Sequence, residues 1–96
     1  MDNFTTRHLN NNPGCNAWIW EYEDGHKTLV SYGTIVADCN PDGWIKVYSM
    51  TRTEYRDHIE QFMKELNVDM DTVDSIYDEC LSLNIHTGEV VDFHEV

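Results

Sequence analysis

The sequence predicts a single α+β domain over residues 1–96, in which a small antiparallel sheet of about four strands is followed by two helices packed on it. Residues 17–49 are rich in β-branched and aromatic residues and are divided by turn sequences, as in a sheet. From residue 53 onward, apolar residues recur every three or four positions, which is typical of an amphipathic helix. With 96 residues, 41% of them hydrophobic, the chain is long enough to bury one core but short for two.

Four segments have the composition of strands, and short turns join them into a meander. In the turn at residues 23–26, an Asp-Gly pair permits positive backbone angles, and Pro41 presets the corner in the turn at residues 40–43. Gly33 indicates a bulge or bend between the second strand and the third. The predicted strands span residues 17–22, 27–32, 34–38 and 44–49.

The first helix is predicted over residues 53–66. Thr51 is followed three residues later by Glu54, which is the spacing of a capping box, in which each side chain binds a free backbone N–H at the helix start. Arg56 and His58 fall outside the apolar stripe of this helix. The stripe consists of Tyr55, Ile59, Phe62, Met63 and Leu66.

The second helix is predicted over residues 72–81, after a stop signal at Asn67. Near the C-terminus, Thr87 and Gly88 indicate a turn, and the β-like residues 90–93 form either a last strand or an extended arm. The polar residues 1–14 are expected to be flexible or irregular. The apolar face of the second helix consists of Val73, Ile76, Tyr77, Cys80 and Leu81.

Several of these segments resemble a family of small uncharacterised proteins from phage, plasmid and bacterial genomes. The resemblance lies in SYGTIVA at residues 31–37, in VYS followed by two threonines at residues 47–53, and in DHIEQF at residues 57–62. It extends over residues 18–66. It implies an origin in a mobile element and an α+β fold, but it implies no activity, catalytic residue or cofactor.

The cysteines and histidines do not follow a metal-site or disulfide pattern. Cys15, Cys39 and Cys80 are odd in number and widely spaced, which argues against a disulfide framework and a zinc ribbon. We therefore expect reduced thiols, no metal and no cofactor. The five histidines are equally scattered, at His8, His26, His58, His86 and His94.

The polar residues near the first helix are weak candidates for catalysis. Ser49 and His58 could join an acid in a nucleophilic triad, but no nucleophile elbow, glycine-rich phosphate loop or His-x-x-x-His pair accompanies them. Arg52 and Arg56 could bind an anion at the helix start, although such arginines are usually solvated or paired with carboxylates. We expect a protein that is not an enzyme.

Acidic residues dominate the chain, with 18 against 6 basic ones and a formal net charge of −12. From Glu54 onward there are twelve acidic residues against two basic ones. Five acidic residues fall within eleven positions, and at ~1.5 Å rise this is one charge per roughly 3 Å, comparable with one phosphate per ~3.4 Å of a DNA strand. They surround much of the helix, so they cannot all face one partner. These candidate partner-binding residues are Asp69, Asp71, Asp74, Asp78 and Glu79.

This charge disfavours direct binding to nucleic acids or membranes and favours basic protein surfaces. One hypothesis is a stoichiometric inhibitor that occupies the basic groove of a nuclease or another nucleic-acid-handling protein. Small acidic phage inhibitors of CRISPR nucleases are similar in type, with a surface that mimics nucleic acid. The chain has neither a secretory signal nor an apolar run of about 20 residues, so we expect it in the cytoplasm, of a host cell if it is phage-encoded.

The alternative hypothesis is a self-associating or regulatory module that binds protein through its sheet. Trp18 and Trp20 flank Ile19, so one side of the predicted strand carries aromatic side chains. The acidity would then serve only solubility. The two hypotheses differ in salt sensitivity, because only the inhibitor would depend on exposed charges.

Overall fold

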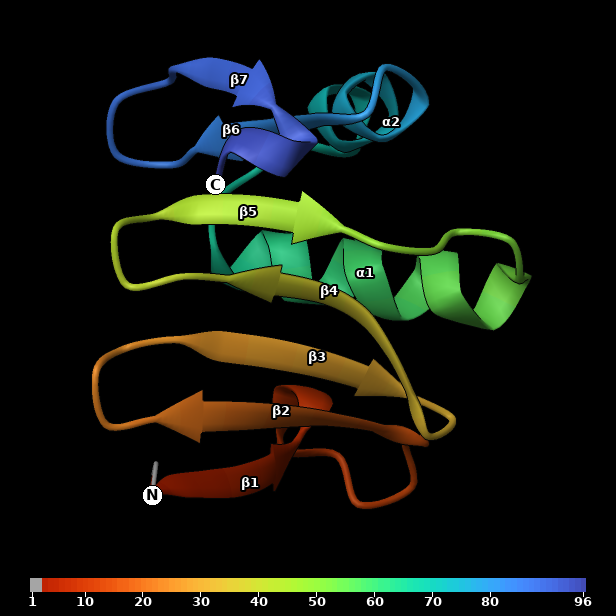
Figure 1. The fold of residues 1–96 in the computed structure, drawn as a ribbon. Coiled ribbons are helices and arrows are strands. Elements are labelled where there is room, and N and C mark those ends of the chain that lie inside the picture. Colours follow the sequence, from red (N-terminus) through yellow and green to blue (C-terminus); the bar gives the residue numbers. More distant parts are fainter. Residues whose placement is uncertain (1–2) are drawn as a thin grey trace.

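The computed structural model describes residues 3–96 and shows seven antiparallel strands in one sheet, with two helices on one face (Figure 1). This confirms the predicted α+β class, with more strands than the predicted four. The strands are β1 (Phe4–His8), β2 (Ala17–Tyr22), β3 (Lys27–Ser31), β4 (Thr34–Cys39), β5 (Trp44–Val47), β6 (Leu81–Asn84) and β7 (Val90–Asp92). The helices are α1 (Thr53–Glu65) and α2 (Met70–Asp78), with short 3-10 turns η1 (Leu9–Asn11) and η2 (Phe93–Glu95).

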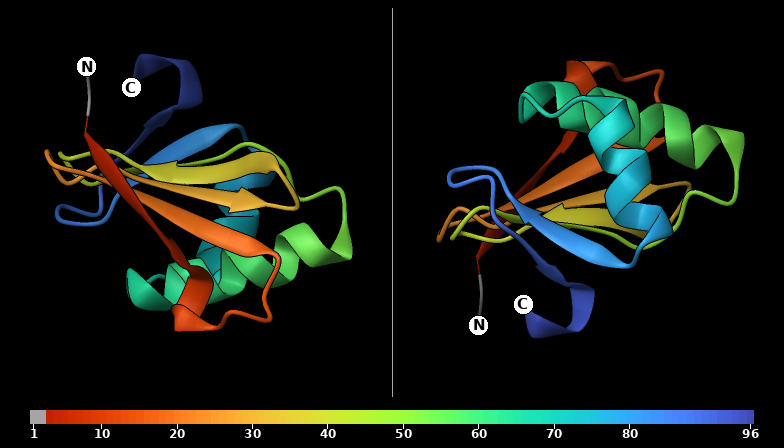
Figure 2. Two further views of the ribbon diagram at one scale, coloured as in Figure 1. Left: turned by 90° about the horizontal axis from the view of Figure 1, so that it is seen from below. Right: turned by 90° about the horizontal axis from the view of Figure 1, so that it is seen from above.

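The strands lie in the sheet in the order of the chain, so each pairs with its sequence neighbours. Both helices fall between β5 and β6, yet these two strands are adjacent. Figure 2 shows α1 and α2 together on one side of the sheet and η2 on the other. Among residues 3–96, η2 is the only helical element on the outer face of the sheet, which is the face opposite α1 and α2.

The hydrophobic core lies between the sheet and the two helices. Alternate residues of each strand point toward the helices, which follows from the two-residue period of a strand. Phe62 and Met63 of α1 are almost completely buried, and Leu9 of η1 closes one end of the core. The largest sheet contributions come from Ile19, Leu29, Val36 and Ile45.

The expectation of an irregular N-terminal segment is wrong for part of residues 1–14, because residues 4–8 form the edge strand β1. This strand pairs along its whole length with β2, from Phe4 opposite Tyr22 to His8 opposite Trp18. An edge strand is bonded on one side only and is open to solvent, so a sequence such as FTTRH can form it without an apolar run.

The predicted capping box at Thr51 is also wrong. Helix α1 begins after Arg52, which makes no side-chain capping bond, and the Thr51 hydroxyl lies 3.1 Å from the hydroxyl of Ser49. The stop at Asn67 is confirmed. Asn67 has φ 61°, and the N–H groups of Asn67 and Val68 donate to the carbonyls of Lys64 and Met63 in a Schellman motif.

Helix α2 is shifted toward the N-terminus relative to the predicted residues 72–81. It begins at Met70 because Asp69 caps it, and it ends at Asp78. Cys80 has φ 55°, a left-handed conformation that ends the helix and turns the chain into β6. Leu81 and its neighbours therefore belong to β6, a strand that the sequence analysis does not predict. Residues 90–92 form a strand, which is the first of the two alternatives for this segment, and not an extended arm.

Gly33 forms a hairpin turn with Tyr32 between β3 and β4. Both residues have positive φ, 48° for Tyr32 and 80° for Gly33, which is the geometry of a two-residue type I′ turn. The bulge lies further along β4, where Val36 is inserted between the partners of Leu29 and Val30. Within residues 3–96, no helix is both long and apolar enough to cross a membrane.

Candidate functional site

Three of the predicted partner-binding acids share one exposed face of α2. Asp71, Asp74 and Asp78 follow each other at steps of three and four residues, which place side chains on the same side of a helix. The opposite side carries the buried Val73 and Ile76. We call Asp71, Asp74 and Asp78 the acidic face of α2.

The other two predicted residues lie at the ends of the helix. Asp69 is the N-cap, and its carboxylate accepts hydrogen bonds from the backbone N–H of Thr72 at 2.9 Å and from the Thr72 hydroxyl at 3.1 Å. These hydrogen bonds lower the pKa of Asp69. Glu79 follows the last helical residue and is exposed. The five acids therefore do not form one surface.

Asp74 is already paired within the protein. Both of its carboxylate oxygens accept hydrogen bonds from the guanidinium of Arg56, one of them at 2.8 Å, so the pair connects α1 to α2. The hydrogen bonds from Arg56 hold the pKa of Asp74 below its usual value. The structure thus directs Arg56 to a carboxylate on the other helix, and not to a free anion site at the start of α1.

Asp71 and Asp78 are exposed and, among the described residues, make no ion pair. Asp78 also contributes to a groove of about 580 Å³ at the end of the sheet. Half of the residues that line this groove have aromatic rings, and Asp78 provides its one carboxylate. The groove is lined by Val47, Tyr48, Ile76, Tyr77, Asp78, Cys80, Phe93 and His94.

Most of the basic side chains are engaged inside the molecule. Arg7 contacts the carboxylates of Glu21 and Glu65, both at 2.6 Å. The ammonium of Lys46 lies 4.8 Å from the centroid of the Phe93 ring. With Arg56 on Asp74 and Arg52 near Glu54, the described residues offer no free arginine cluster for an anion.

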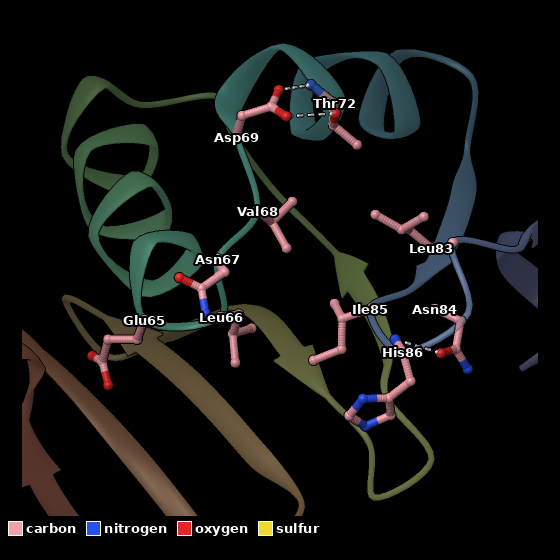
Figure 3. A pocket seen from close by; sticks show the side chains of 11 residues that line it. Glu65, Leu66, Asn67, Val68, Asp69, Thr72, Leu83, Asn84, Ile85 and His86 are labelled. Atoms are coloured by element: carbon pink, nitrogen blue, oxygen red, sulfur yellow. Dashed lines mark hydrogen bonds between the residues drawn. The ribbon is translucent and has the colours of Figure 1, made fainter.

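A second groove, of about 490 Å³, lies between the α1–α2 connection and the end of β6 (Figure 3). Its polar groups are largely committed to the fold. Asp69 caps α2, and the side-chain oxygen of Asn84 accepts from the backbone N–H groups of His86 and Thr87. We assign no ligand to this groove. Its lining residues include Leu66, Val68, Leu83 and Ile85.

The outer face of the sheet carries the aromatic side chains predicted from the alternation in β2. Ile19 is completely buried, whereas Trp18 is 39% exposed. Phe4 is 47% exposed, and its ring centroid lies 5.4 Å from that of Trp20 and 5.1 Å from that of Tyr22. Phe4, Trp18, Trp20 and Tyr22 form this aromatic face. Trp18, Trp20 and Tyr22 alternate with the buried Ala17 and Ile19, and Phe4 lies opposite Tyr22, so the face is on the side of the sheet away from the core.

The candidate catalytic residues are not brought together. The Ser49 hydroxyl contacts Thr51, whereas His58 is buried in the interface between α1 and the sheet. The expectation that His58 lies outside the apolar stripe is therefore wrong. His58 follows Tyr55 by three residues and precedes Phe62 by four, a spacing that places all three on one face. This signal was present in the sequence.

Residues 3–96 contain no group of three or more His, Cys, Asp or Glu side chains that could hold a metal ion. All three cysteines are free. Comparisons of the chain with protein-family models, curated proteins and solved structures give no match.

Proposed function

We propose that this chain is a non-enzymatic acidic protein that acts as a stoichiometric inhibitor of a nucleic-acid-handling protein by occupying its basic surface. The observation that carries the proposal is the acidic face of α2, where Asp71 and Asp78 are exposed and unpaired among the described residues. Such a surface attracts basic proteins and repels nucleic acid, so it competes with nucleic acid for the same groove.

The groove beside Asp78 supports a specific contact in addition to general charge attraction. An arginine or lysine of the partner would meet the Asp78 carboxylate, with its aliphatic part against Tyr77 and Phe93. Aromatic rings also attract cations that approach their faces. Arginines that fill such pockets are among the residues that contribute most to protein–protein affinity.

The net charge and the engaged arginines favour a protein partner over nucleic acid. The chain has a formal net charge of −12, and the guanidinium groups of Arg7 and Arg56 are bound to carboxylates. In this proposal the chain acts in the cytoplasm of the host of a mobile element, in the manner of small acidic phage inhibitors of CRISPR nucleases.

The test is capture of partners from host lysate, identification by mass, and titration with the purified partner. The double variant Asp71→Asn and Asp78→Asn should weaken binding by roughly 5- to 30-fold, since each exposed charge contributes up to ~1 kcal/mol. The control Glu23→Gln and Asp42→Asn removes the same charge from hairpin turns and should change the affinity much less. An equal loss of affinity in both variants would show that the net charge of the chain, and not the position of Asp71 and Asp78, determines binding.

A second candidate function is self-association through the aromatic face, with a second copy of this chain as the partner. Phe4 and Trp18 are exposed, which favours it. Asp38 of β4 lies opposite Lys46 of β5 in the strand register on the same side of the sheet, so the region beside the aromatic face carries both signs of charge. Two copies of a chain with a net charge of −12 would meet with least repulsion here.

This second function predicts a dimer whose population rises with concentration in sedimentation experiments. Trp18→Ser should shift the chain toward the monomer, because it removes exposed apolar surface from the aromatic face. Val90→Ser is the matched control, since Val90 is 46% exposed but lines a groove beside α2 on the other side of the sheet. A chain that stays monomeric at every accessible concentration would contradict this candidate.

A further inference from the structure

Three side chains that are distant in sequence meet between α1 and the sheet, near the start of β2 and the end of β3. The imidazole of His58 in α1 lies between Cys15, in the loop before β2, and Ser31, the last residue of β3. The Cys15 Sγ is 3.5 Å from Nε2 of His58, and the Ser31 Oγ is 2.7 Å from Nδ1. Each ring nitrogen therefore has one partner, and these partners differ in chemistry.

The surroundings hold the imidazole in place and limit its access to water. Ser31 is completely buried and His58 is only 9% exposed. The ring of Tyr32 stacks against the imidazole, with centroids 5.9 Å apart and planes at 21°. Cys15 is partly exposed and packs in part against the core. Tyr32 covers the imidazole beside it.

The protonation state of His58 suits a base. Burial lowers the pKa of His58, and the charges of Asp57 and Glu54 oppose this shift only in part. The imidazole is therefore mainly neutral near neutral pH and has a lone pair to offer. A base needs the tautomer in which Nδ1–H donates to the Ser31 Oγ, and in that tautomer the lone pair lies on Nε2, opposite the thiol of Cys15.

We propose that Cys15 is a nucleophilic thiol, with His58 as its base and Ser31 as the positioning residue, and that it reacts with small, uncharged electrophiles. Small reagents fit the partly covered sulfur, and uncharged ones avoid repulsion by the net charge of −12. Cys15 is thus a residue that reacts covalently, without a catalytic cycle. It is independent of the partner-binding function proposed above.

The reaction with an alkyl halide illustrates the step. The sulfur forms a bond to the electrophilic carbon, the carbon–halogen bond breaks, and the halide leaves with the bonding electrons. The thiol proton moves to Nε2 of His58. The resulting imidazolium donates from Nδ1 to the Ser31 oxygen, which stabilises the positive charge in a site shielded from water.

The two other cysteines are internal controls. Cys80 is exposed but makes no hydrogen bond to an imidazole among the described residues, whereas Cys39 is buried and burial raises its pKa. If exposure alone set reactivity, Cys80 would react first. If the imidazole sets it, Cys15 would react first although it is less exposed.

The experiment measures alkylation of each cysteine by iodoacetamide in the native chain at neutral pH, with peptide mapping by mass. Cys15 should react about tenfold or more faster than Cys80, and His58→Gln should remove this advantage without changing Cys80. Ser31→Ala keeps the imidazole and should move the pH–rate profile of Cys15 toward higher pH, which a purely structural role would not do.

Circular dichroism shows which variants fold. If His58→Gln does not fold, two other measurements test the proposal. They are the ratio of the alkylation rates of Cys15 and Cys80 in the native chain, and the pH dependence of the Cys15 rate in Ser31→Ala. A Cys15 that reacts no faster than Cys80, or a Cys15 profile that is the same with and without the Ser31 hydroxyl, would overturn the proposal.

Discussion

Asp69 is a carboxylate that the fold uses before any partner approaches. One carboxylate oxygen accepts from the backbone N–H of Thr72, which is one of the free donors at the start of α2, and the other accepts from the Thr72 hydroxyl. They also lower the pKa of Asp69 in the folded state. As pH falls, the Asp69 carboxylate is therefore protonated in the unfolded state before it is protonated in the folded state. The cap contributes fully to the free energy of unfolding only above pH ~4, the usual pKa range of an Asp.

We predict that Asp69→Ala lowers the free energy of unfolding at neutral pH, whereas Asp69→Asn, which is also a good cap, changes it little. As pH falls below ~4 and through the folded pKa of Asp69, the native chain should lose stability relative to Asp69→Asn. Denaturant melts across this pH range measure both effects. Identical pH dependence in the native chain and in Asp69→Asn would contradict the assignment of the cap.

At the scale of single residues, local partners could be predicted from sequence and distant ones could not. His58 could have been placed in the interface from its spacing to Tyr55 and Phe62. The partner of Arg56 is Asp74, 18 residues away on another helix. That pairing depends on how α1 and α2 cross, which residue spacing does not determine.

Helix α1 is held by its packing against the sheet and not by the predicted cap. Ile59→Ala or Phe62→Ala should lower the free energy of unfolding by roughly 2 to 5 kcal/mol, because both side chains are buried and would leave cavities. Thr51→Ala should cost less than about 0.5 kcal/mol, because its hydroxyl is exposed and, among residues 3–96, bonds only to Ser49. Denaturant melts that rank Thr51→Ala with the core substitutions would contradict this packing.

At the scale of elements, hairpins were the most predictable part of the chain. β2 to β5 have apolar alternation and turn residues within a short stretch, so local signals suffice. β6 has only four residues, and its start depends on the left-handed conformation of Cys80, which cysteine seldom adopts. β1 is polar and forms because β2 offers it a free edge.

At the scale of the whole molecule, the two candidate binding surfaces lie on opposite sides of the sheet. The acidic face belongs to α2, in the helical layer that Figure 2 shows, and the aromatic face is on the other side of the sheet because its residues alternate with buried core residues. Binding to a basic protein and self-association are therefore separable by variants on one side or the other.

The separation also predicts different responses to salt. Attraction through Asp71 and Asp78 should weaken steadily as salt rises, because exposed charges are screened beyond a Debye length of ~8 Å at physiological ionic strength. Self-association through Trp18 should persist, since apolar burial does not depend on that screening. The sequence predicted the acidity and the aromatic alternation, but the side of the molecule on which each lies required the fold.

The central claim is most directly tested by competition between this chain and nucleic acid for the purified captured partner. A labelled nucleic acid bound to that partner is titrated with the native chain, with the Asp71→Asn and Asp78→Asn variant, and with the Glu23→Gln and Asp42→Asn control. We predict that the native chain and the control displace the nucleic acid at one chain per partner, and that the α2 variant needs a clearly higher concentration. A stable ternary complex of partner, nucleic acid and chain would contradict the claim.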